Sequence, residues 1–520
     1  MVDLGGFSIP KSNQTQIIAV IAVYMLVVVA FGFFVKWQSS RQNASGGKMA
    51  SFLTGGGNLG MVSVAMITLT NVLAGGTMVS QPGLNYNVGF INVICVFGGF
   101  TAAMLSLGVC GRKVAILSQR TGATTILQLM RHRYQSKKFT ICVGISIFVF
   151  SILLASGQLM MAAKIITTMT GASTYYVGLA IAGIVTVIYA LSGGVKSMAK
   201  VAVFQGFVMI GGAFILFLFV YREVFAIHGS FQGAMEFIAA EKPSMLLDDT
   251  WMPLYAIGTA ISSGWLPFAM AGTAQGMLTY RSPKALSRAI VLSTVCFFAC
   301  HMMMSPAGLF GFTLNTGLSA DMVTIYLSSS LLPGALAGLV ISGCLAAIQS
   351  TVAANLIIGA ASLAKDVYKD CIKPEMDDNS VSRLNAAALV VAFLGASFVA
   401  IRPSELTQLM NNFTVAGLAM GFVIPLLFGL YWKKATAEGA FWATISGVAM
   451  FAVGYYFTTF QPEFWKTYFL NVLPCVPAIL VSMVVMILVS QKTQKVPLGI
   501  LKVWFSSDYD EKFTREYNLK

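Results

Sequence analysis

Long apolar runs follow one another along this chain and are separated by short polar segments. A helix needs about 20 mostly apolar residues to cross the hydrocarbon core of a membrane, and the chain has about 13 runs of that length. They cover residues 16–37, 61–79, 87–111, 139–165, 173–192, 196–221, 251–279, 286–315, 333–364, 384–402, 408–431, 435–459 and 468–490. We therefore predict an all-α polytopic membrane protein with about 13 transmembrane helices.

Composition supports the same class of protein. Of the 520 residues, 57% are hydrophobic and only 10% are charged, whereas a soluble domain carries about 25% charge. These figures exclude a water-soluble protein, and they exclude a disordered chain, which needs low hydrophobicity and high net charge. The polar segments contain no nucleotide-binding glycine motif and are too short for a soluble catalytic domain. Function is therefore predicted to reside among the helices, and no enzyme activity is predicted.

The basic residues predict an orientation. Lys and Arg number 33 against 19 Asp and Glu, for a net charge of +14. Most of these basic residues fall on one side if the N-terminus is outside and the spans alternate, and cytoplasmic loops are the ones enriched in Lys and Arg. We therefore predict a plasma (inner) membrane protein with a cytoplasmic C-terminus. Topology and attraction to anionic membrane lipid explain the charge excess, so neither a nucleic-acid partner nor an obligate protein partner is predicted.

Glycine and proline interrupt two of the predicted spans. Residues 68–83 contain paired glycines and end on Pro-Gly, and residues 262–276 also carry Gly and Pro within the apolar run. Backbone groups freed inside a membrane need partners, so a broken span is tolerated where it lines a protein-enclosed or hydrated cavity. One such span could equally be a kinked helix or a close helix contact. Two of them, five spans apart and running in opposite directions, predict the binding site of a transporter.

The two broken spans define a domain organisation. Each begins a unit of five spans, and the two units have opposed topology. The single transmembrane transporter domain, residues 1–520, then comprises a leading helix, two inverted repeats, two trailing helices and a cytoplasmic tail. These parts cover residues 16–37, 61–221, 251–431, 435–490 and 491–520.

Two adjacent hydroxyl residues, Ser350 and Thr351, lie inside an otherwise small and apolar span. Hard cations such as Na⁺ take oxygen ligands, and hydroxyls together with carbonyls freed at a helix break can supply them. The alternative is that both hydroxyls bond back to carbonyls one turn earlier in their own helix. The spacing alone leaves both interpretations open.

At these residues the chain resembles the sodium/solute symporter family. Four segments carry the resemblance, and they are residues 345–369, 415–440, 191–205 and 155–164. The family has an inverted five-plus-five repeat with a leading helix and discontinuous first helices. The resemblance implies a Na⁺ site made by the hydroxyls of Ser350 and Thr351 and the carbonyls of Ala347, Thr70 and Leu73.

Two carboxylates that many members of that family carry are missing. The first broken span reads Thr-Asn-Val at residues 70–72, and residues 201–202 are Val-Ala where many members have Thr-Asp. No Asp or Glu occurs between Asp3 and Glu223. Acids within the membrane usually mark proton relays or cation sites, so their absence argues against proton symport and leaves neutral oxygens as ion ligands. It also keeps open an ion-uncoupled transporter or a transporter-like solute sensor.

Elsewhere, the acids nearest to the spans, Asp366 and Glu405, lie at span ends. Within the spans, His301 is either a hydrogen-bonded packing residue or a cavity group linked to protons. Lys164, near an outer span end, either extends to the interface or attracts an anion there.

Polar residues beside the two helix breaks are the candidates for solute binding. They are Asn71, Thr77, Gln81, Thr273 and Gln275, with Gln158 and Gln205 on neighbouring spans. The N-terminus of a broken helix favours a carboxylate, so we expect a zwitterionic or anionic organic solute. The predicted function is Na⁺-coupled symport of such a small solute into the cell.

Overall fold

The computed structural model describes residues 11–40, 53, 59–94, 106–171, 174–191, 194–246, 258, 271–278, 283–403, 407–494 and 496–505. Within these residues every regular element is helical. Nine of the described helices are long and apolar enough to cross a membrane. They are α1 (Lys11–Ser40), α8 (Lys137–Thr170), α10 (Gly194–His228), α14 (Pro283–Leu314), α16 (Gly334–Ala361, continued by η5, Ser362–Ile372), α17 (Asp378–Ala400), α18 (Thr407–Tyr431), α19 (Ala437–Phe460) and α21 (Cys475–Lys492).

One further span is broken. Helix α3 (Met61–Val72) and the helical segment Gly76–Val88, formed by η1 (Gly76–Ser80) and α4 (Gln81–Val88), are bent by 54° at a short break. This discontinuity confirms the predicted break near the paired glycines. Of the second interrupted segment, residues 262–270 lie outside the described residues, and residues 271–276 form the short helix α13 (Ala271–Gly276).

The long helices overlap predicted spans, with two differences. The broken span continues to Val88, beyond its predicted end at residue 79, and the predicted span 468–490 begins inside the short helix that precedes α21. Helix α9 (Tyr175–Leu191) is apolar but shorter than the nine long helices. The middle of the predicted span 87–111 and most of the predicted span 251–279 fall outside the described residues, so the number of spans stays a prediction. The all-helical polytopic architecture is confirmed.

The remaining helices are short and join the long ones. They are η2 (Ser106–Gly111), α6 (Arg112–Thr121), α7 (Ile126–Tyr134), α11 (Phe231–Glu241), η3 (Pro243–Met245), α13 (Ala271–Gly276), η4 (Ala320–Met322), α15 (Val323–Leu331), α20 (Pro462–Phe469) and α22 (Leu498–Phe505). Polar caps start several helices, because a side-chain oxygen satisfies an N–H that the first turn leaves free. Thr125 caps α7 in this way, and Thr436 caps α19.

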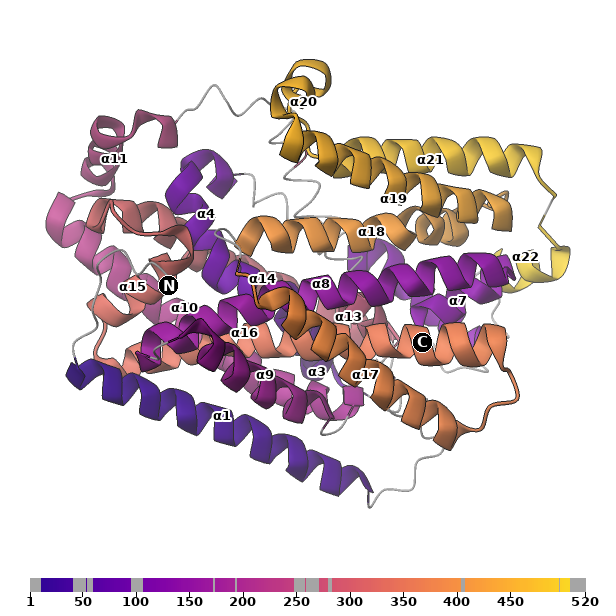
Figure 1. The fold of residues 1–520 in the computed structure, drawn as a ribbon, viewed down its shortest axis with the longest axis horizontal. Coiled ribbons are helices and arrows are strands. Elements are labelled where there is room, and N and C mark those ends of the chain that lie inside the picture. Colours follow the sequence, from indigo (N-terminus) through magenta and orange to yellow (C-terminus); the bar gives the residue numbers. More distant parts are fainter. Residues whose placement is uncertain are drawn as a thin grey trace.

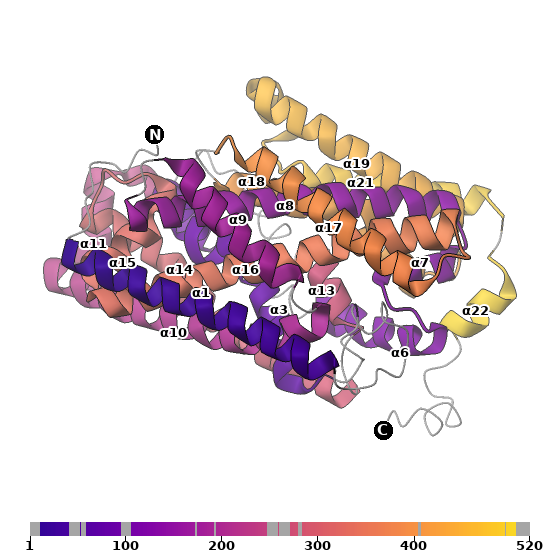
Figure 2. The ribbon, with the colours of Figure 1, turned by 60° about the horizontal axis from the view of Figure 1, so that its bottom comes forward.

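Helix α16 forms the centre of the bundle. It lies among α1, α8 and α10 in both ribbon views (Figures 1 and 2), and it packs on all three. Its most apolar window is 83% buried within the protein, against 28% for α1 and for α21. A central helix this buried is protected from lipid on every side, so its polar residues must find partners inside the protein.

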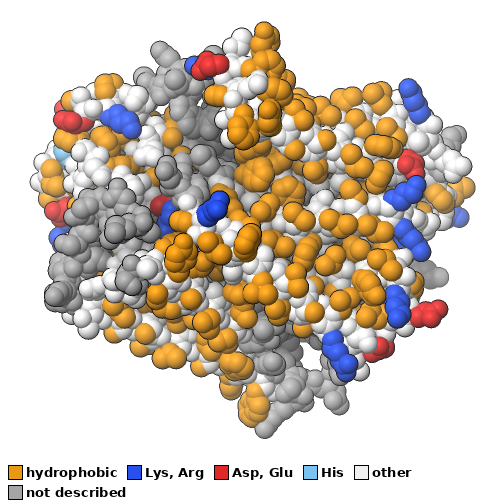
Figure 3. Space-filling model, viewed as in Figure 1, with side chains coloured by type: hydrophobic (Ala, Val, Ile, Leu, Met, Phe, Trp, Pro, Cys, Tyr) orange, Lys and Arg blue, Asp and Glu red, His pale blue; other side chains and the backbone are white. Residues whose placement is uncertain are grey.

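Apolar side chains dominate the outer surface. Figure 3 shows hydrophobic side chains across the middle of one face, with Lys and Arg side chains gathered mainly at one end. Large apolar residues such as Leu26 and Phe398 are strongly exposed. A surface of this kind is stable in contact with lipid rather than water, in agreement with a multi-pass membrane protein.

Candidate functional site

The break in the first broken span leaves backbone groups without helical partners. Helix α3 ends at Val72, and Leu73 departs from helical geometry with a ψ of 43°. The N–H of Leu73 still donates to the Leu69 carbonyl at 2.7 Å. Carbonyls in the last turn of a helix have no amide one turn further on. The carbonyl of Thr70 is therefore available to another element.

That other element is α16. The hydroxyl of Ser350 lies 3.1 Å from the Thr70 carbonyl oxygen and 3.0 Å from that of Ala347. The hydroxyl of Thr351 lies 3.4 Å and 2.9 Å from the same two oxygens. The structure thus brings together four of the five predicted sodium ligands. Each hydroxyl bonds back to Ala347 along its own helix and also reaches the Thr70 carbonyl at the break. The back-bonding interpretation is therefore observed, and the role of the pair as Na⁺ ligands stays a prediction.

Leu73 provides the fifth predicted ligand. It lies at the break itself, three residues after Thr70, and its side chain is buried. The contacts that join the other four oxygens do not include its carbonyl. Its assignment therefore stays a prediction.

The oxygen cluster is neutral and buried. Thr70, Ser350 and Thr351 are each at most 3% exposed. A hydroxyl has one hydrogen to donate and two lone pairs to offer. The hydroxyl hydrogens now point at the two carbonyl oxygens, so a bound cation would contact the carbonyl and hydroxyl oxygens while the hydroxyl hydrogens turn away. The arrangement suits a hard monovalent cation and offers no group that takes up a proton near neutral pH.

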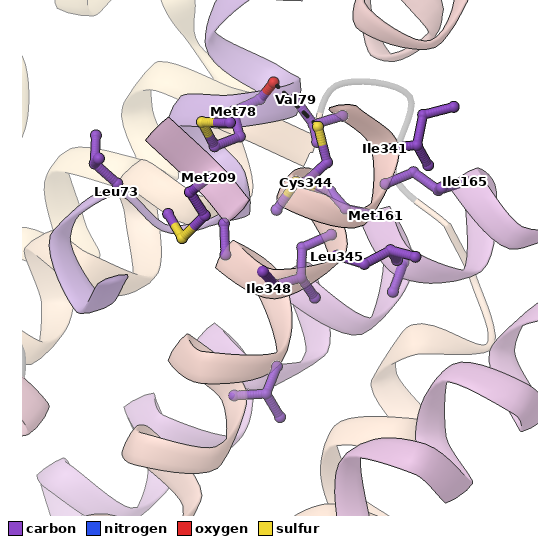
Figure 4. Packing of buried hydrophobic residues seen from close by; sticks show 14 of the residues in the cluster. Leu73, Met78, Val79, Met161, Ile165, Met209, Ile341, Cys344, Leu345 and Ile348 are labelled. Carbon is purple, nitrogen blue, oxygen red and sulfur yellow. Dashed lines mark hydrogen bonds between the residues drawn. The ribbon is translucent and has the colours of Figure 1, made fainter. Parts of the chain in front are cut away.

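Packing brings the continuation of the broken span against α16. Met78 and Val79 of η1 face Cys344 of α16 (Figure 4), and the Cys344 thiol donates to the Met78 carbonyl at 3.8 Å. A Cβ added at Gly75 would meet the Ile348 side chain of α16 and the amide oxygen of Gln158. Glycine is therefore required at this position because the neighbouring chain approaches so closely.

Gln158 on α8 satisfies one amide freed by the break. Its Oε1 accepts from the Gly75 N–H at 3.0 Å, and its Nε2 donates to Asn411 Oδ1 at 2.9 Å. The side chain therefore connects the break to α18. Asn411 was not predicted as a site residue, although an amide within an apolar span is a signal that could have identified it.

The other polar candidates do not gather in one place. Gln81 donates to Asn85 on the next turn of α4. Gln205 donates to Tyr24 on α1, and Gln275 donates to the carbonyls of Leu53 and Thr124. The remaining candidates are Asn71 and Thr273, which are buried, and Thr77, which is half-buried. Only Gln158 among the glutamines lies at the first break.

A buried ion pair lies close to the continuation of the broken span. Lys164 Nζ is 2.5 Å from Asp321 Oδ2, and neither residue is more than 7% exposed. The expectation that Lys164 extends to the interface is wrong, because a carboxylate between α14 and α15 holds it inside the protein. The Thr407 hydroxyl donates to Asp321 at 3.0 Å and lies 2.9 Å from the Ser80 hydroxyl of η1. Sequence reasoning passed over Asp321 because it lies in a connection between two spans.

The two other titratable candidates lie at different places. Asp366, predicted at a span end, is buried in η5 and accepts from the Thr125 hydroxyl at 2.7 Å. Glu405 lies outside the described residues. The His301 ring contacts Phe297 edge to face, with ring centroids 4.4 Å apart. The ring packs on Phe297, but its buried Nδ1 has no hydrogen-bond partner among the described residues, so neither of the two roles considered for His301 is established.

Comparison with known proteins identifies relatives over most of the chain. The model described as "Sodium:solute symporter family" matches residues 52–447. The sodium/pantothenate symporter of Escherichia coli (strain K12) is 27% identical over 491 residues, which is 93% of this chain and 98% of the relative. The sodium/proline symporter of Staphylococcus aureus (strain Newman) is 23% identical over 93% of each chain.

Solved structures share the fold. A Na⁺-coupled sialic acid symporter in a substrate-bound outward-open state has a TM-score of 0.74 at 15% identity, over 93% of this chain and 98% of that chain. A nucleobase-cation-symport-1 family transporter in a closed conformation has a TM-score of 0.53 at 14% identity, over 88% and 96%. At these identities the likeness shows the fold alone.

Proposed function

The chain belongs to the sodium:solute symporter family and is a transporter rather than an enzyme, and we propose that it couples Na⁺ entry to uptake of a small organic solute. The observation that carries this proposal is the meeting of the Ser350 and Thr351 hydroxyls with the Thr70 carbonyl at the end of α3. This contact joins the broken span to the central helix. An ion bound there would hold the two together.

We propose that Na⁺ is bound by the hydroxyls of Ser350 and Thr351 and by the carbonyls of Thr70, Leu73 and Ala347. All five are uncharged oxygens, so the ion brings the only formal charge into the cluster. Na⁺ binding would stabilise the arrangement in which α3 and α16 are in contact at the break. A ligand shifts a conformational equilibrium only by binding one state better, and this site exists only while the two elements meet.

The solute is proposed to be zwitterionic or anionic. Pantothenate, proline and sialic acid, which appear in the names of the similar proteins, all carry a carboxyl group. After the break, helical structure resumes at Gly76 and continues through α4, and the N-terminus of such a segment favours negative charge. Asn71 and Thr77 beside the break are the proposed first contacts of the solute. Gln81, Thr273 and Gln275 also remain proposed solute contacts, with Gln158 and Gln205 as second choices.

The proposed organisation follows the resemblance. A leading helix (16–37) precedes two inverted repeats (61–221 and 251–431), two trailing helices (435–490) and a tail (491–520). We propose a plasma-membrane location with the N-terminus outside. The basic residues of α6, α7 and α22 would then lie on the cytoplasmic side, where Lys and Arg are enriched.

Reconstituted vesicles test the proposal. Purified protein is first screened by thermal shift against carboxylate-bearing solutes, beginning with pantothenate and proline, with and without NaCl. A solute that stabilises only with Na⁺ is then used for uptake. Uptake should require an inward Na⁺ gradient, and the double variant Ser350→Ala with Thr351→Ala should need more Na⁺.

A matched control removes a hydroxyl elsewhere. Thr186 on α9 is buried and bonds back to the Ala182 carbonyl at 2.7 Å, so Thr186→Ala should leave the Na⁺ requirement unchanged. Uptake that persists at the same rate without Na⁺ would contradict coupling and identify an ion-uncoupled transporter. Solute binding without accumulation against a gradient would identify a sensor.

A further inference from the structure

The leading helix α1 lies against the central helix along a buried stripe. The buried members of the stripe are Ile17, Ile21, Tyr24, Val28 and Val35. Their spacing places them on one helical face, while the opposite face of α1 is exposed at residues such as Leu26. Tyr24 is the polar member of this otherwise apolar stripe.

The Tyr24 hydroxyl joins three helices. It donates to Gln349 Oε1 on α16 at 3.1 Å and accepts from Gln205 Nε2 on α10 at 3.2 Å. Its ring stacks on Phe204, with centroids 6.3 Å apart. All three hydrogen-bonding residues are at most 5% exposed. Polar groups this buried are costly to leave without partners, so the three helices are held in one relative arrangement.

Helices α1 and α16 also pack closely together near the start of α16. A Cβ at Gly338 would lie 2.7 Å from the Val20 side chain, and one at Gly334 would lie 2.7 Å from the Gln16 side chain. Small residues allow helices in membranes to approach this closely. Helix α1 therefore contacts α16 from its first turns up to Gln349, the residue before Ser350.

We propose that Tyr24 is a positioning residue for the ion site, and this proposal rests on the proposed function. Successive residues of a helix point about 100° apart, so Gln349 faces α1 and α10 while Ser350 and Thr351 reach the Thr70 carbonyl. Holding the Gln349 amide fixes the rotation of this turn of α16. That rotation sets the distance of both hydroxyls from the break.

The test measures Na⁺ binding without needing a solute. The thermal stability of the purified full-length chain is titrated with NaCl at constant ionic strength, with choline chloride as the replacement salt. Tyr24→Phe keeps the ring on Phe204 and removes only the hydroxyl. The half-saturating Na⁺ concentration should rise about three- to tenfold. A purely structural role would lower the stability at every Na⁺ concentration and leave half-saturation unchanged.

Two further variants complete the test. Tyr175→Phe removes a comparable hydroxyl, which donates to Ala400 at 2.9 Å away from α16, and should leave half-saturation unchanged. Gln349→Leu removes the acceptor, and combining it with Tyr24→Phe should add nothing to the larger single effect if both act through one bond. An unchanged half-saturation in Tyr24→Phe overturns the positioning role. If Ser350→Ala with Thr351→Ala leaves it unchanged as well, the proposed ion site itself fails.

Discussion

Lys164 Nζ on α8 lies 2.5 Å from Asp321 Oδ2 in the connection between α14 and α15. The carboxylate accepts from two further donors, the backbone N–H and the hydroxyl of Thr407 at the start of α18. Three segments that are distant in sequence therefore meet at one acid. Breaking a buried ion pair is costly, because the partner that stays behind keeps its charge without compensation.

Asp321→Asn is predicted to destabilise the protein strongly. The amide leaves the Lys164 ammonium buried without a counter-charge, and such a loss costs about 3–5 kcal/mol. Equilibrium unfolding in detergent measures the effect. Replacing both residues by apolar ones, Lys164→Met with Asp321→Leu, should cost less than Asp321→Asn alone.

The exposed pair of Arg222 and Glu223 supplies the control, since its side chains are 70% and 37% exposed. Glu223→Gln should change the free energy of unfolding by less than about 1 kcal/mol. Equal effects of Asp321→Asn and Glu223→Gln would contradict the burial argument.

Gln158→Leu is predicted to lower the stability of the protein by removing a hydrogen bond at the break of the first broken span. The Gly75 N–H would lose its acceptor inside the membrane, at a cost of about 1–3 kcal/mol. Asn411→Ala keeps the Gly75 bond and should cost less. Thermal unfolding compares the two variants. A larger loss in Asn411→Ala would show that the contact with α18, rather than the freed amide, is what Gln158 chiefly supports.

Part of the geometry of the proposed ion site is local to one helix. In any helix, the hydroxyls of residues 350 and 351 lie within a turn of the carbonyl of residue 347. The break after α3 was marked in the sequence by the paired glycines Gly75 and Gly76. The assignment of these oxygens as Na⁺ ligands, like the contact between Thr70 and α16, rested on the family resemblance.

Asp321 and the partners of the glutamines could not be predicted in this way. The Lys164–Asp321 pair spans 157 residues of sequence, and the Tyr24–Gln349 bond spans 325. Such pairs depend on which helix faces meet in the folded bundle, and periodicity within one span carries no information on that. An acid in a polar connection resembles a solvated loop residue until its neighbours are known.

Gly308→Ala is predicted to disturb the contact between α14 and α4. A Cβ at this position would overlap the backbone of Pro82, and overpacking of this kind costs about 1–3 kcal/mol. Gly211 on α10 is the matched control, because a Cβ there meets nothing within 4 Å. Alanine favours helix over glycine by up to about 1 kcal/mol, so Gly211→Ala should be neutral or stabilising. A melting temperature of Gly308→Ala at or above that of Gly211→Ala would contradict the close contact.

Sodium itself is predicted to stabilise the folded chain through the four-oxygen cluster. An ion that binds only the folded state adds about 2.7 kcal/mol at a hundredfold excess over its dissociation constant. Thermal unfolding in NaCl against choline chloride measures this, and KCl shows whether the cluster selects by ion size.

Ser350→Ala with Thr351→Ala removes two of the four oxygens that meet at the break. The Na⁺-dependent increment should then disappear, while the stability in choline chloride falls only by the loss of the two hydroxyl bonds. Thr186→Ala should keep the full increment, since its hydroxyl bonds only within α9. An increment that survives in the double variant would place the ion elsewhere in the bundle.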